Sequence, residues 1–393
     1  MTDEKPLSGL RVLELARILA GPWTGQLLAD LGADVVKVER AREGDDTRHW
    51  GPPFVESESG ERLGAAYYYG CNRGKRCVEA DFETETGRAL VRRLAANADV
   101  VIENFKVGGL RKFGLDYEGL KKVRPDIVYC SITGFGQSGP YAPRAGYDFL
   151  IQGMGGIMHV TGQPDGPPTK VGVSIVDILT GLYAANAIQA ALLRRARTGQ
   201  GAYIDCALLD TSAAILGFQA LNYFVGGLEG RRMGNAHPNV LPYDVYKASD
   251  GDIIIATGND GQFRKLVAAL GAPELADDAR FTLMRDRAAN RAAMDEALNA
   301  LTSRLPRSEL LSRFEAAGVP AGPINAIPDV FADPQIAFRG MKIETPNARA
   351  KGGATPGVRA PIMLDGAPVA AARHAPALGE HTQDVLTDPR WGG

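Results

Sequence analysis

Asp177 is the residue whose type and surroundings best suit covalent chemistry. It lies between Val176 and Ile178, where a helical pattern begins after a stretch rich in glycine and proline. The amino-terminal end of a helix carries partial positive charge, which can keep a partly buried carboxylate ionised. An ionised carboxylate beside a ligand cleft can attack an acyl group and hold it covalently. An aspartate that only caps a helix would have the same surroundings, so the residues alone leave both roles open.

Five other side chains can contribute charge or a proton to a site. His237 lies in a loop next to Pro238, where it can act as a general base or serve as an ordinary surface residue. Arginine and lysine bind carboxylates and phosphates through charge-assisted hydrogen bonds, and they are equally typical of a solvated surface. The four cations of interest are Arg40, Arg48, Arg144 and Lys112.

Residues 134–139 fit the GxGxxG pattern and follow a predicted strand. A dinucleotide site needs a helix to begin within this pattern, so that its amino terminus meets the pyrophosphate. Pro140 and Pro143 follow at once, so we interpret the segment as a loop rather than a nicotinamide or flavin site. The sequence also lacks the Walker A, HExxH and GxSxG patterns.

Composition limits the partners and the compartment. The chain of 393 residues has 44 Lys and Arg against 46 Asp and Glu, a formal net charge of −2, and no basic run that predicts nucleic-acid binding. No apolar run reaches the roughly 18 residues needed to span a membrane, and the start of the chain lacks the apolar stretch of a secretory signal. The four cysteines form no CxxC pair and no metal-ligand spacing with histidine. We therefore expect a cytoplasmic protein without a metal, a membrane or a nucleic acid.

The first third of the chain alternates strand-like and helix-like segments. Strand, helix and strand at this spacing predict a parallel sheet covered by helices on both faces, which is a doubly wound α/β domain. The apolar strands are typical of strands that are buried on both sides. Strands are predicted at residues 10–15, 34–39, 99–103 and 126–132, and helices at residues 24–31, 84–96 and 117–123.

The rest of the chain predicts a second, smaller α/β domain. A helix over residues 178–197, a strand over 203–208 and a helix over 209–224 lead to two glycines, after which new strands are expected at 243–247 and 252–257. The proline-rich tail is expected to return to the first domain as irregular strands. We therefore predict a large domain over 1–225, a small domain over 226–327 and a return segment over 328–393.

Several longer runs resemble the class III CoA-transferases of the CaiB/BaiF type. The runs follow the order of that family and extend over nearly the whole chain. They include VLEL at 12–15, LAGP at 19–22, GDDTR at 44–48, VIENF at 101–105, VDILTG at 176–181, GVPAGP at 318–323 and LGEHT at 378–382.

The resemblance implies a ring-shaped protomer in an interlocked homodimer, with coenzyme A as a co-substrate and no permanently bound cofactor. It identifies Asp177 with the family's nucleophile, which forms acyl anhydride and CoA thioester intermediates. It also implies CoA contacts at Arg17, Ile18, Leu19, Ala20, Arg40, Asn104, Phe105 and Lys112.

Within the family, the runs at 44–48, 51–55 and 129–134 are most similar to the succinate-hydroxymethylglutarate CoA-transferase branch, which acts on dicarboxylates. This similarity implies transfer of CoA from succinyl-CoA or glutaryl-CoA to a C4 to C6 dicarboxylate, whose distal carboxylate would pair with Arg48, Arg144 or His237. Formyl-CoA:oxalate transfer is a weaker alternative, because residues 237–242 replace a run of glycines in that branch. A 2-methylacyl-CoA racemase is another, but Tyr147 stands where the racemases have a histidine base.

Overall fold

The computed structural model describes residues 5–393, which divide into two compact units. The larger unit combines the described part of the first 157 residues with Lys170–Leu221 and Pro334–Gly393. The smaller unit consists of Met158–Thr169 and Asn222–Asp333. The short segment Met158–Thr169 belongs to the smaller unit, although it precedes the main part of that unit by about 50 residues in the sequence.

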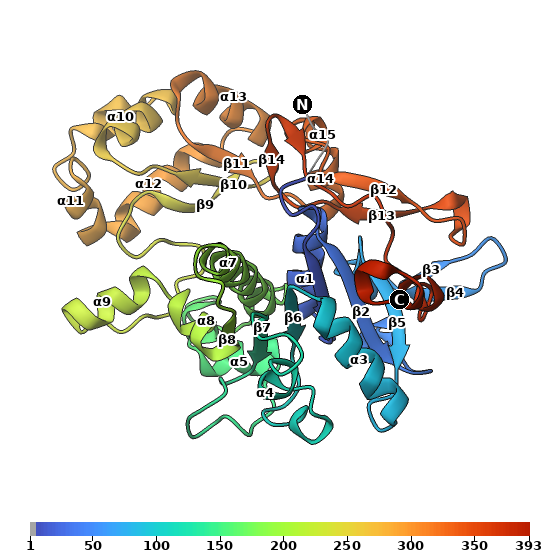
Figure 1. The fold of residues 1–393 in the computed structure, drawn as a ribbon. Coiled ribbons are helices and arrows are strands. Elements are labelled where there is room, and N and C mark those ends of the chain that lie inside the picture. Colours follow the sequence, from blue (N-terminus) through green and yellow to red (C-terminus); the bar gives the residue numbers. More distant parts are fainter. Residues whose placement is uncertain (1–4) are drawn as a thin grey trace. The chain divides into compact units, whose positions relative to one another are not determined.

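A six-stranded parallel sheet forms the centre of the larger unit (Figure 1). Its strand order is β5-β2-β1-β6-β7-β8, and all five pairings are parallel. A central parallel sheet in a mixed α/β fold confirms the coarse prediction from the sequence. The strands are β1 (Arg11–Glu14), β2 (Asp34–Arg40), β5 (Arg76–Ala80), β6 (Val100–Glu103), β7 (Val128–Thr133) and β8 (Ala202–Ala207).

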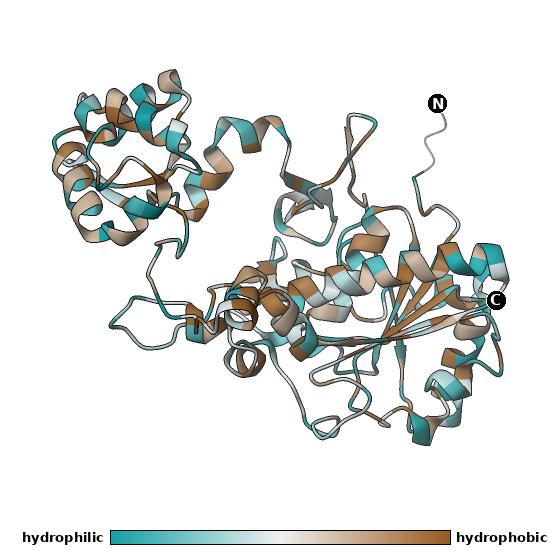
Figure 2. Cartoon of the chain, turned by 90° about the vertical axis from the view of Figure 1, so that its left-hand side faces the viewer, coloured by the Kyte–Doolittle hydropathy of each residue, from teal (hydrophilic) through white to brown (hydrophobic). Residues whose placement is uncertain are grey.

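Helices cover both faces of this sheet. On one face, α1 (Ala20–Asp30) packs against α7 (Ile175–Thr198), and their small residues allow close contact. On the other face, α3 (Glu85–Asn97) and α16 (Thr382–Leu386) contact the sheet. Each face has its own apolar core, and Figure 2 shows the strands in predominantly hydrophobic colours.

α7 is long and apolar enough to cross a membrane by length and composition alone. A core helix passes the same test, and α7 buries Val176, Ala184 and Ile188 in the core between the sheet and α1. We therefore assign α7 to the helix layer of the α/β fold.

Other elements of the larger unit lie around the sheet edges. Arg76 in β5 forms an ion pair of 3.0 Å with Asp388, which anchors the carboxyl-terminal segment. The remaining elements are β3 (Phe54–Glu56), β4 (Arg62–Ala65), α2 (Ala66–Tyr69), α4 (Tyr117–Leu120), α5 (Asp148–Met154), α8 (Leu208–Ala214), α15 (Pro334–Phe338), β12 (Lys342–Pro346), β13 (Ala354–Val358), β14 (Met363–Leu364) and β15 (Ala367–Pro368).

The smaller unit is built on a three-stranded antiparallel sheet, in the order β11-β10-β9. Helices pack on it around an apolar core that contains Phe263, Leu298 and Phe314. Its elements are β9 (Tyr243–Ala248), β10 (Gly251–Ala256), β11 (Ala321–Pro323), α10 (Asp260–Ala269), α11 (Met284–Ala289), α12 (Arg291–Thr302), α13 (Arg307–Ala317) and α14 (Ile327–Ala332). Two helices contain residues that are assigned to both units, α6 (Ile157–Val160) and α9 (Phe218–Gly226).

The predicted helices all differ somewhat in their bounds from those in the structure, and three of the differences have a clear form. The first begins at Ala20, four residues earlier than expected, because Pro22 is tolerated in the first helical turn. The helix predicted over 209–224 is divided into α8 and α9, with Gly217 in the left-handed region at φ 52°. The helix predicted over 117–123 is the single turn α4.

Candidate active site

A cavity of about 410 Å³ at the carboxyl ends of β6 and β7 contains Asp177. Ligand sites of open parallel sheets lie at this end, because the loops that leave neighbouring strands meet there. The cavity brings together most of the side chains that the sequence predicted to bind CoA or substrate. These are Arg17, Ile18, Leu19, Ala20, Asn104, Phe105, Lys112, Arg144, Tyr147 and Asp177.

A second cavity, of about 300 Å³, adjoins the first. Arg17, Phe105 and Phe113 line both cavities, so the two spaces share a wall. Arg40 lines the second cavity, together with Phe82. The wall of this second cavity combines apolar side chains with three basic residues, Arg17, Lys37 and Arg40, and six acidic ones, Glu39, Glu43, Asp45, Asp46, Asp81 and Glu83.

Asp177 occupies the first turn of α7, as its third residue. The residue at the cap position is Ser174, whose side chain makes no capping hydrogen bond. Asp148 of α5 supplies the cap instead, because its Oδ1 accepts hydrogen bonds from the backbone N–H of Val176 at 2.8 Å and of Asp177 at 3.2 Å. The sequence analysis did not find this role, since Asp148 lies 28 residues away from the helix end that it caps.

The pKa of the Asp177 carboxyl is raised to about 7, first by burial and then by the negative charge of Asp148. The expectation that the helix terminus would hold this side chain ionised is therefore corrected. A cap that is itself a carboxylate adds negative charge to the end of the helix, where the dipole would otherwise favour an anion. A carboxyl with a pKa near 7 exists in both charge states at neutral pH.

Tyr67 is a further polar neighbour of Asp177 that the sequence analysis did not single out. Burial raises its pKa to about 12, and its hydroxyl is hydrogen-bonded to Ser174 at the start of α7. The hydroxyl therefore stays protonated and neutral at physiological pH. Its ring packs edge-on against Trp50, with the ring centroids 5.3 Å apart.

The loops that follow β1 and β6 are fastened to each other. The Asn104 side chain accepts a hydrogen bond from the Arg17 backbone N–H at 2.9 Å and donates one to the Arg17 carbonyl at 2.6 Å. The Arg17 guanidinium extends to Asp46, at 2.7 Å. The Asn104 side chain, which itself lines the cavity, thus holds the backbone at Arg17 in place.

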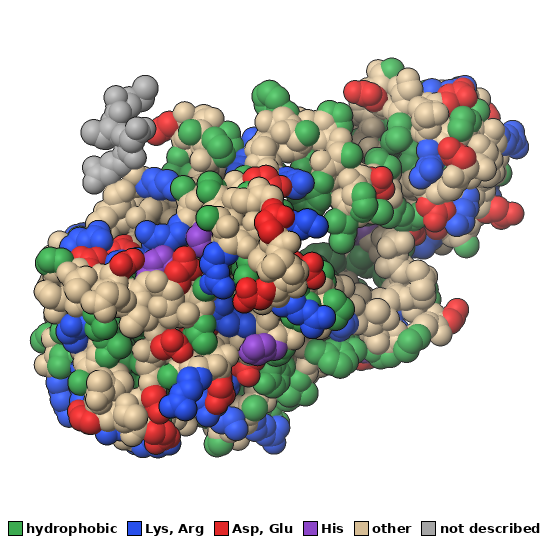
Figure 3. All heavy atoms as spheres, turned by 90° about the vertical axis from the view of Figure 1, so that its right-hand side faces the viewer, with side chains coloured by type: hydrophobic (Ala, Val, Ile, Leu, Met, Phe, Trp, Pro, Cys, Tyr) green, Lys and Arg blue, Asp and Glu red, His purple; other side chains and the backbone are tan. Residues whose placement is uncertain are grey.

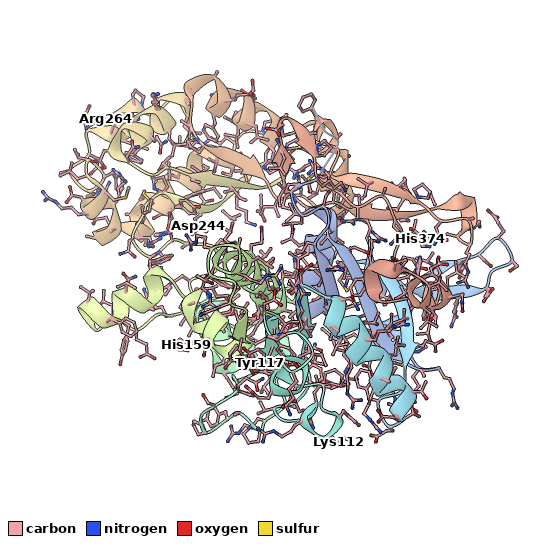
Figure 4. All side chains as sticks on the ribbon, viewed as in Figure 1. Lys112, Tyr117, His159, Asp244, Arg264 and His374 are labelled. Carbon is pink, nitrogen blue, oxygen red and sulfur yellow. The ribbon has the colours of Figure 1, made fainter. Side chains whose placement is uncertain are left out.

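Arg40 and Lys112 are exposed cations at the edges of the two cavities. Arg40 pairs with Glu43 at 2.9 Å, and Lys112 pairs with Glu83 at 2.9 Å. Exposed pairs of this kind contribute little to stability, so an incoming phosphate can replace the glutamates at small cost. Figure 4 labels Lys112 and, in α4, Tyr117 of the same unit.

Arg48 lies outside both cavities and is fully engaged elsewhere. Its guanidinium forms two hydrogen bonds with the Glu39 carboxylate, at 2.8 and 2.7 Å, and one with the Tyr68 hydroxyl at 2.6 Å. The group also stacks on the Tyr68 ring, 3.8 Å from its centroid. The structure thus gives Arg48 a buried structural role in place of the predicted substrate contact.

Arg144 lies in the cavity wall beside Asp177, in the loop that precedes α5. Its guanidinium stacks on the Tyr141 ring at 3.9 Å, and none of the ion pairs among residues 5–393 involves it. The loop is held close to the preceding glycine-rich loop, because a Cβ built on Gly134 would lie 2.6 Å from the Cα of Gly146. Arg144 is therefore a cation that can pair with an anionic substrate.

His237 belongs to the smaller unit. Its Nδ1 accepts hydrogen bonds from the backbone N–H groups of Asn239 and Val240, each at 3.0 Å. Burial and the charge of Arg291 lower its pKa. At neutral pH the imidazole is neutral, so it does not supply a positive charge for a carboxylate.

Residues 5–393 contain no group of three or more His, Cys, Asp or Glu side chains arranged to hold a metal ion. The four cysteines are free thiols, and Cys71, Cys77 and Cys130 are buried. On the face of the molecule drawn in Figure 3, acidic and basic side chains are interspersed.

Several known proteins are similar to this chain over nearly its whole length, in sequence and in structure. A succinate–glutarate CoA-transferase of Agrobacterium fabrum is 53% identical over 392 residues, covering 99% of this chain and 98% of the relative. A succinyl-CoA:glutarate CoA-transferase of Homo sapiens is 40% identical over 388 residues, covering 99% of this chain and 87% of the relative. The crystal structure of a CAIB/BAIF family protein from Brucella suis is 57% identical and superposes with a TM-score of 0.87, covering 98% of this chain and 99% of that one.

The family model for CoA-transferase family III matches residues 7–382 of this sequence. This match covers the parallel sheet, both cavities and the return segment as far as residue 382. It confirms the resemblance that the sequence motifs predicted. The chain is an enzyme that belongs to CoA-transferase family III.

Proposed function

We propose that this enzyme transfers CoA from succinyl-CoA or glutaryl-CoA to a C4 to C6 dicarboxylate, with Asp177 as the nucleophile. The relatives named above support this choice of substrates through their names. The observation that carries the proposal is the Asp177 carboxyl in a cavity that also presents Arg144. The Asp177 carboxylate can attack an acyl carbon, and the Arg144 guanidinium can bind the second carboxylate of a diacid.

The proposed reaction begins when the Asp177 carboxylate attacks the thioester carbonyl of the donor. The C–S bond breaks, which leaves an aspartyl anhydride and a CoA thiolate. The thiolate then attacks the aspartyl carbonyl, so that an aspartyl-CoA thioester forms and the donor carboxylate leaves. An acceptor carboxylate attacks this thioester and releases the thiolate again. In the last step the thiolate attacks the acceptor carbonyl of the new anhydride, which frees Asp177 and the product.

CoA is proposed to lie across the two adjoining cavities. Its thioester end would meet Asp177 beside the segment from Arg17 to Ala20, and Asn104 and Phe105 would contact the middle of the molecule. Its nucleotide would occupy the cavity lined by Phe82, with Arg40 and Lys112 near the phosphates.

Arg144 is the residue that we propose to bind the distal carboxylate of the acceptor, and Tyr147 lies in the same wall. Arg48 is already paired with Glu39 and His237 is neutral at physiological pH, so neither is proposed to bind this carboxylate. An arginine can bind a carboxylate through two parallel hydrogen bonds, which favours a diacid over a monoacid.

We also propose that the chain forms the interlocked homodimer of ring-shaped protomers that its family resemblance implies, in the cytoplasm. Large apolar side chains of α7 and α9 are exposed in the single chain, an arrangement that is typical of surfaces covered by a partner. These side chains include Leu182, Tyr183, Leu193, Leu221, Tyr223, Phe224 and Val225.

Intact mass spectrometry after incubation with succinyl-CoA tests the proposed nucleophile. We expect the wild type to gain the mass of CoA less one water, and hydroxylamine to remove this adduct, whereas Asp177→Ala gains nothing. Asp210→Asn is the matched control, because Asp210 is also the third residue of a helix but is exposed. A wild type that forms no adduct, but exchanges deuterium into a 2-methylacyl-CoA, would contradict the proposal and favour a racemase.

Steady-state kinetics with glutarate as acceptor test the role of Arg144. We expect Arg144→Met to raise the KM for glutarate by roughly 10- to 100-fold, while the KM for succinyl-CoA changes much less. Arg144→Lys should recover part of the loss, because it keeps the charge but not the paired geometry. An unchanged KM for glutarate in Arg144→Met would exclude this residue as the anchor.

A further inference from the structure

Ile18 has a backbone conformation that a β-branched residue rarely adopts. Its φ is 71°, in the left-handed region, and it lies between β1 and α1 in the wall of the Asp177 cavity. In this region the branched side chain of an isoleucine is crowded by its own backbone, so the conformation persists only where the surroundings enforce it. Such strain in a ligand-binding segment is frequently part of how the segment works.

Asp45 provides the contact that enforces this conformation. The backbone N–H of Ile18 donates to both oxygens of the Asp45 carboxylate, at 3.2 Å each. On the other side of Ile18, α1 begins at Ala20 without a side-chain cap. The Cys71 thiol also donates a weak hydrogen bond to the Ile18 carbonyl at 3.6 Å, so Asp45 is the charged group that acts directly on the backbone of Ile18.

Asp45 is itself fixed by a buried cation. Lys37 Nζ lies 3.0 Å from the Asp45 carboxylate and 3.1 Å from that of Glu14, and all three side chains are fully buried. Burial alone would raise the pKa of Asp45, but Lys37 and the hydrogen bonds from Thr47 hold it below its ordinary value. The anion that receives the Ile18 N–H is thus kept ionised by a buried cation.

We infer that Asp45 is a positioning residue, which holds Ile18 in the left-handed conformation so that the backbone from Arg17 to Ala20 is preset to receive the acyl-CoA. Without this contact, Ile18 relaxes to negative φ and rotates the peptide groups on both of its sides. The segment must then be reordered at the expense of binding. This inference rests on the proposed function, which places the acyl-CoA against the same segment.

Calorimetric titration with CoA, combined with a rescue substitution, tests the inference. We expect Asp45→Ala to weaken CoA binding at least about tenfold, because Ile18 is no longer held in its strained conformation. Glycine adopts positive φ without strain. The double variant Asp45→Ala with Ile18→Gly should therefore bind CoA within about threefold of Ile18→Gly alone. A residue that only stabilised the fold would not be rescued in this way.

Asp30→Ala is the matched control, since Asp30 is also a buried carboxylate in an ion pair, at 2.6 Å from Arg73, but does not touch the Arg17–Ala20 backbone. It should lose stability yet bind CoA as the wild type does. If Asp45→Ala fails to fold, Asp45→Asn with the same glycine rescue replaces it.

Two results would overturn the inference while leaving the proposed function intact. One is an Asp45 variant that binds CoA as tightly as the wild type, and the other is a loss of binding that Ile18→Gly does not restore. A wild type that does not bind CoA would instead overturn the proposed function, and the inference with it.

Discussion

Buried carboxyl groups occur in two regions of the larger unit, with opposite charge behaviour. Beneath the loop after β1, the pKa of Glu39 and that of Asp45 both lie below their ordinary values. Around the cavity, the pKa of Asp177 and that of Glu103 are raised to about 7. Burial pushes all four values upward, so burial cannot be the cause of the difference.

The difference lies in the cations. Glu39 pairs with Arg48 at 2.7 Å, and Asp45 pairs with Lys37 at 3.0 Å, so a buried positive charge outweighs the desolvation of each carboxylate. Among the described residues, neither Asp177 nor Glu103 forms an ion pair, and Asp177 has the negative charge of Asp148 nearby. The paired carboxylates fix the structure, whereas Asp177, which is unpaired and lines the cavity, remains free to react.

Removing the unpaired carboxyl should have the largest effect. We expect Asp177→Asn to reduce kcat by about 10³-fold or more, because the amide cannot attack a thioester. The same change should stabilise the protein at pH 8 by about 1–3 kcal/mol. Between pH 4 and 7 the folded state retains a proton that the unfolded state has lost, so stability falls as the pH rises, and the amide removes this dependence.

Urea denaturation of Asp177→Asn and the wild type at pH 5 and pH 8 measures this effect. The difference in the free energy of unfolding between the variant and the wild type should be larger at pH 8 than at pH 5. If the wild type and Asp177→Asn are equally stable at both pH 5 and pH 8, burial does not raise the pKa of Asp177.

Removing a cation from the paired region should affect stability rather than chemistry. We expect Arg48→Met to lower the free energy of unfolding by about 3–5 kcal/mol, because Glu39 is left buried without its partner. Adding Glu39→Gln should recover part of this loss, since the uncompensated charge disappears. Urea denaturation at pH 7 checks both variants, and an Arg48→Met variant as stable as the wild type would show that this cation does not stabilise the buried Glu39 carboxylate.

The smallest expected effect is a shift of the pH profile when Asp148, the neighbour of Asp177, is replaced. The rate should rise with pH as Asp177 ionises around pH 7, and Asp148→Asn should move this rise to lower pH, because one of the two causes of the raised pKa is removed. The asparagine oxygen can still accept the backbone hydrogen bonds that cap α7. The pH profile of kcat/KM for succinyl-CoA measures the shift, and a profile that stays in place would show that Asp148 acts only as a cap.

The sequence predicted most of the sheet, because β1, β2, β6 and β7 are apolar runs of the kind found in parallel strands. It did not reveal β5, whose Arg76 and Glu79 look like exposed charges until Asp34 is seen to pair with Arg76 at 2.5 Å. Local periodicity carries no information about such long-range partners.

The sequence also did not reveal the long-range contacts of the site residues. Motifs indicated Asp177 and the segment from Arg17 to Ala20 through the family resemblance, and the structure places them in one cavity. The assignment of Arg48 to the substrate was wrong because this side chain is buried in an ion pair with Glu39. Asp148 was missed because the residue that caps a helix usually lies next to the helix end in the sequence.

The contact between Gly134 and Gly146 has a consequence for redesigning this enzyme. A side chain at either position would push one loop away from the other, so the Gly146 end of the loop that carries Arg144 is fixed by backbone contact. We expect that the residues before Gly146, Arg144 among them, can be varied without displacing the helix that carries the nucleophile. A mutant library confined to residues 141–145 is therefore the economical route to new acceptor acids.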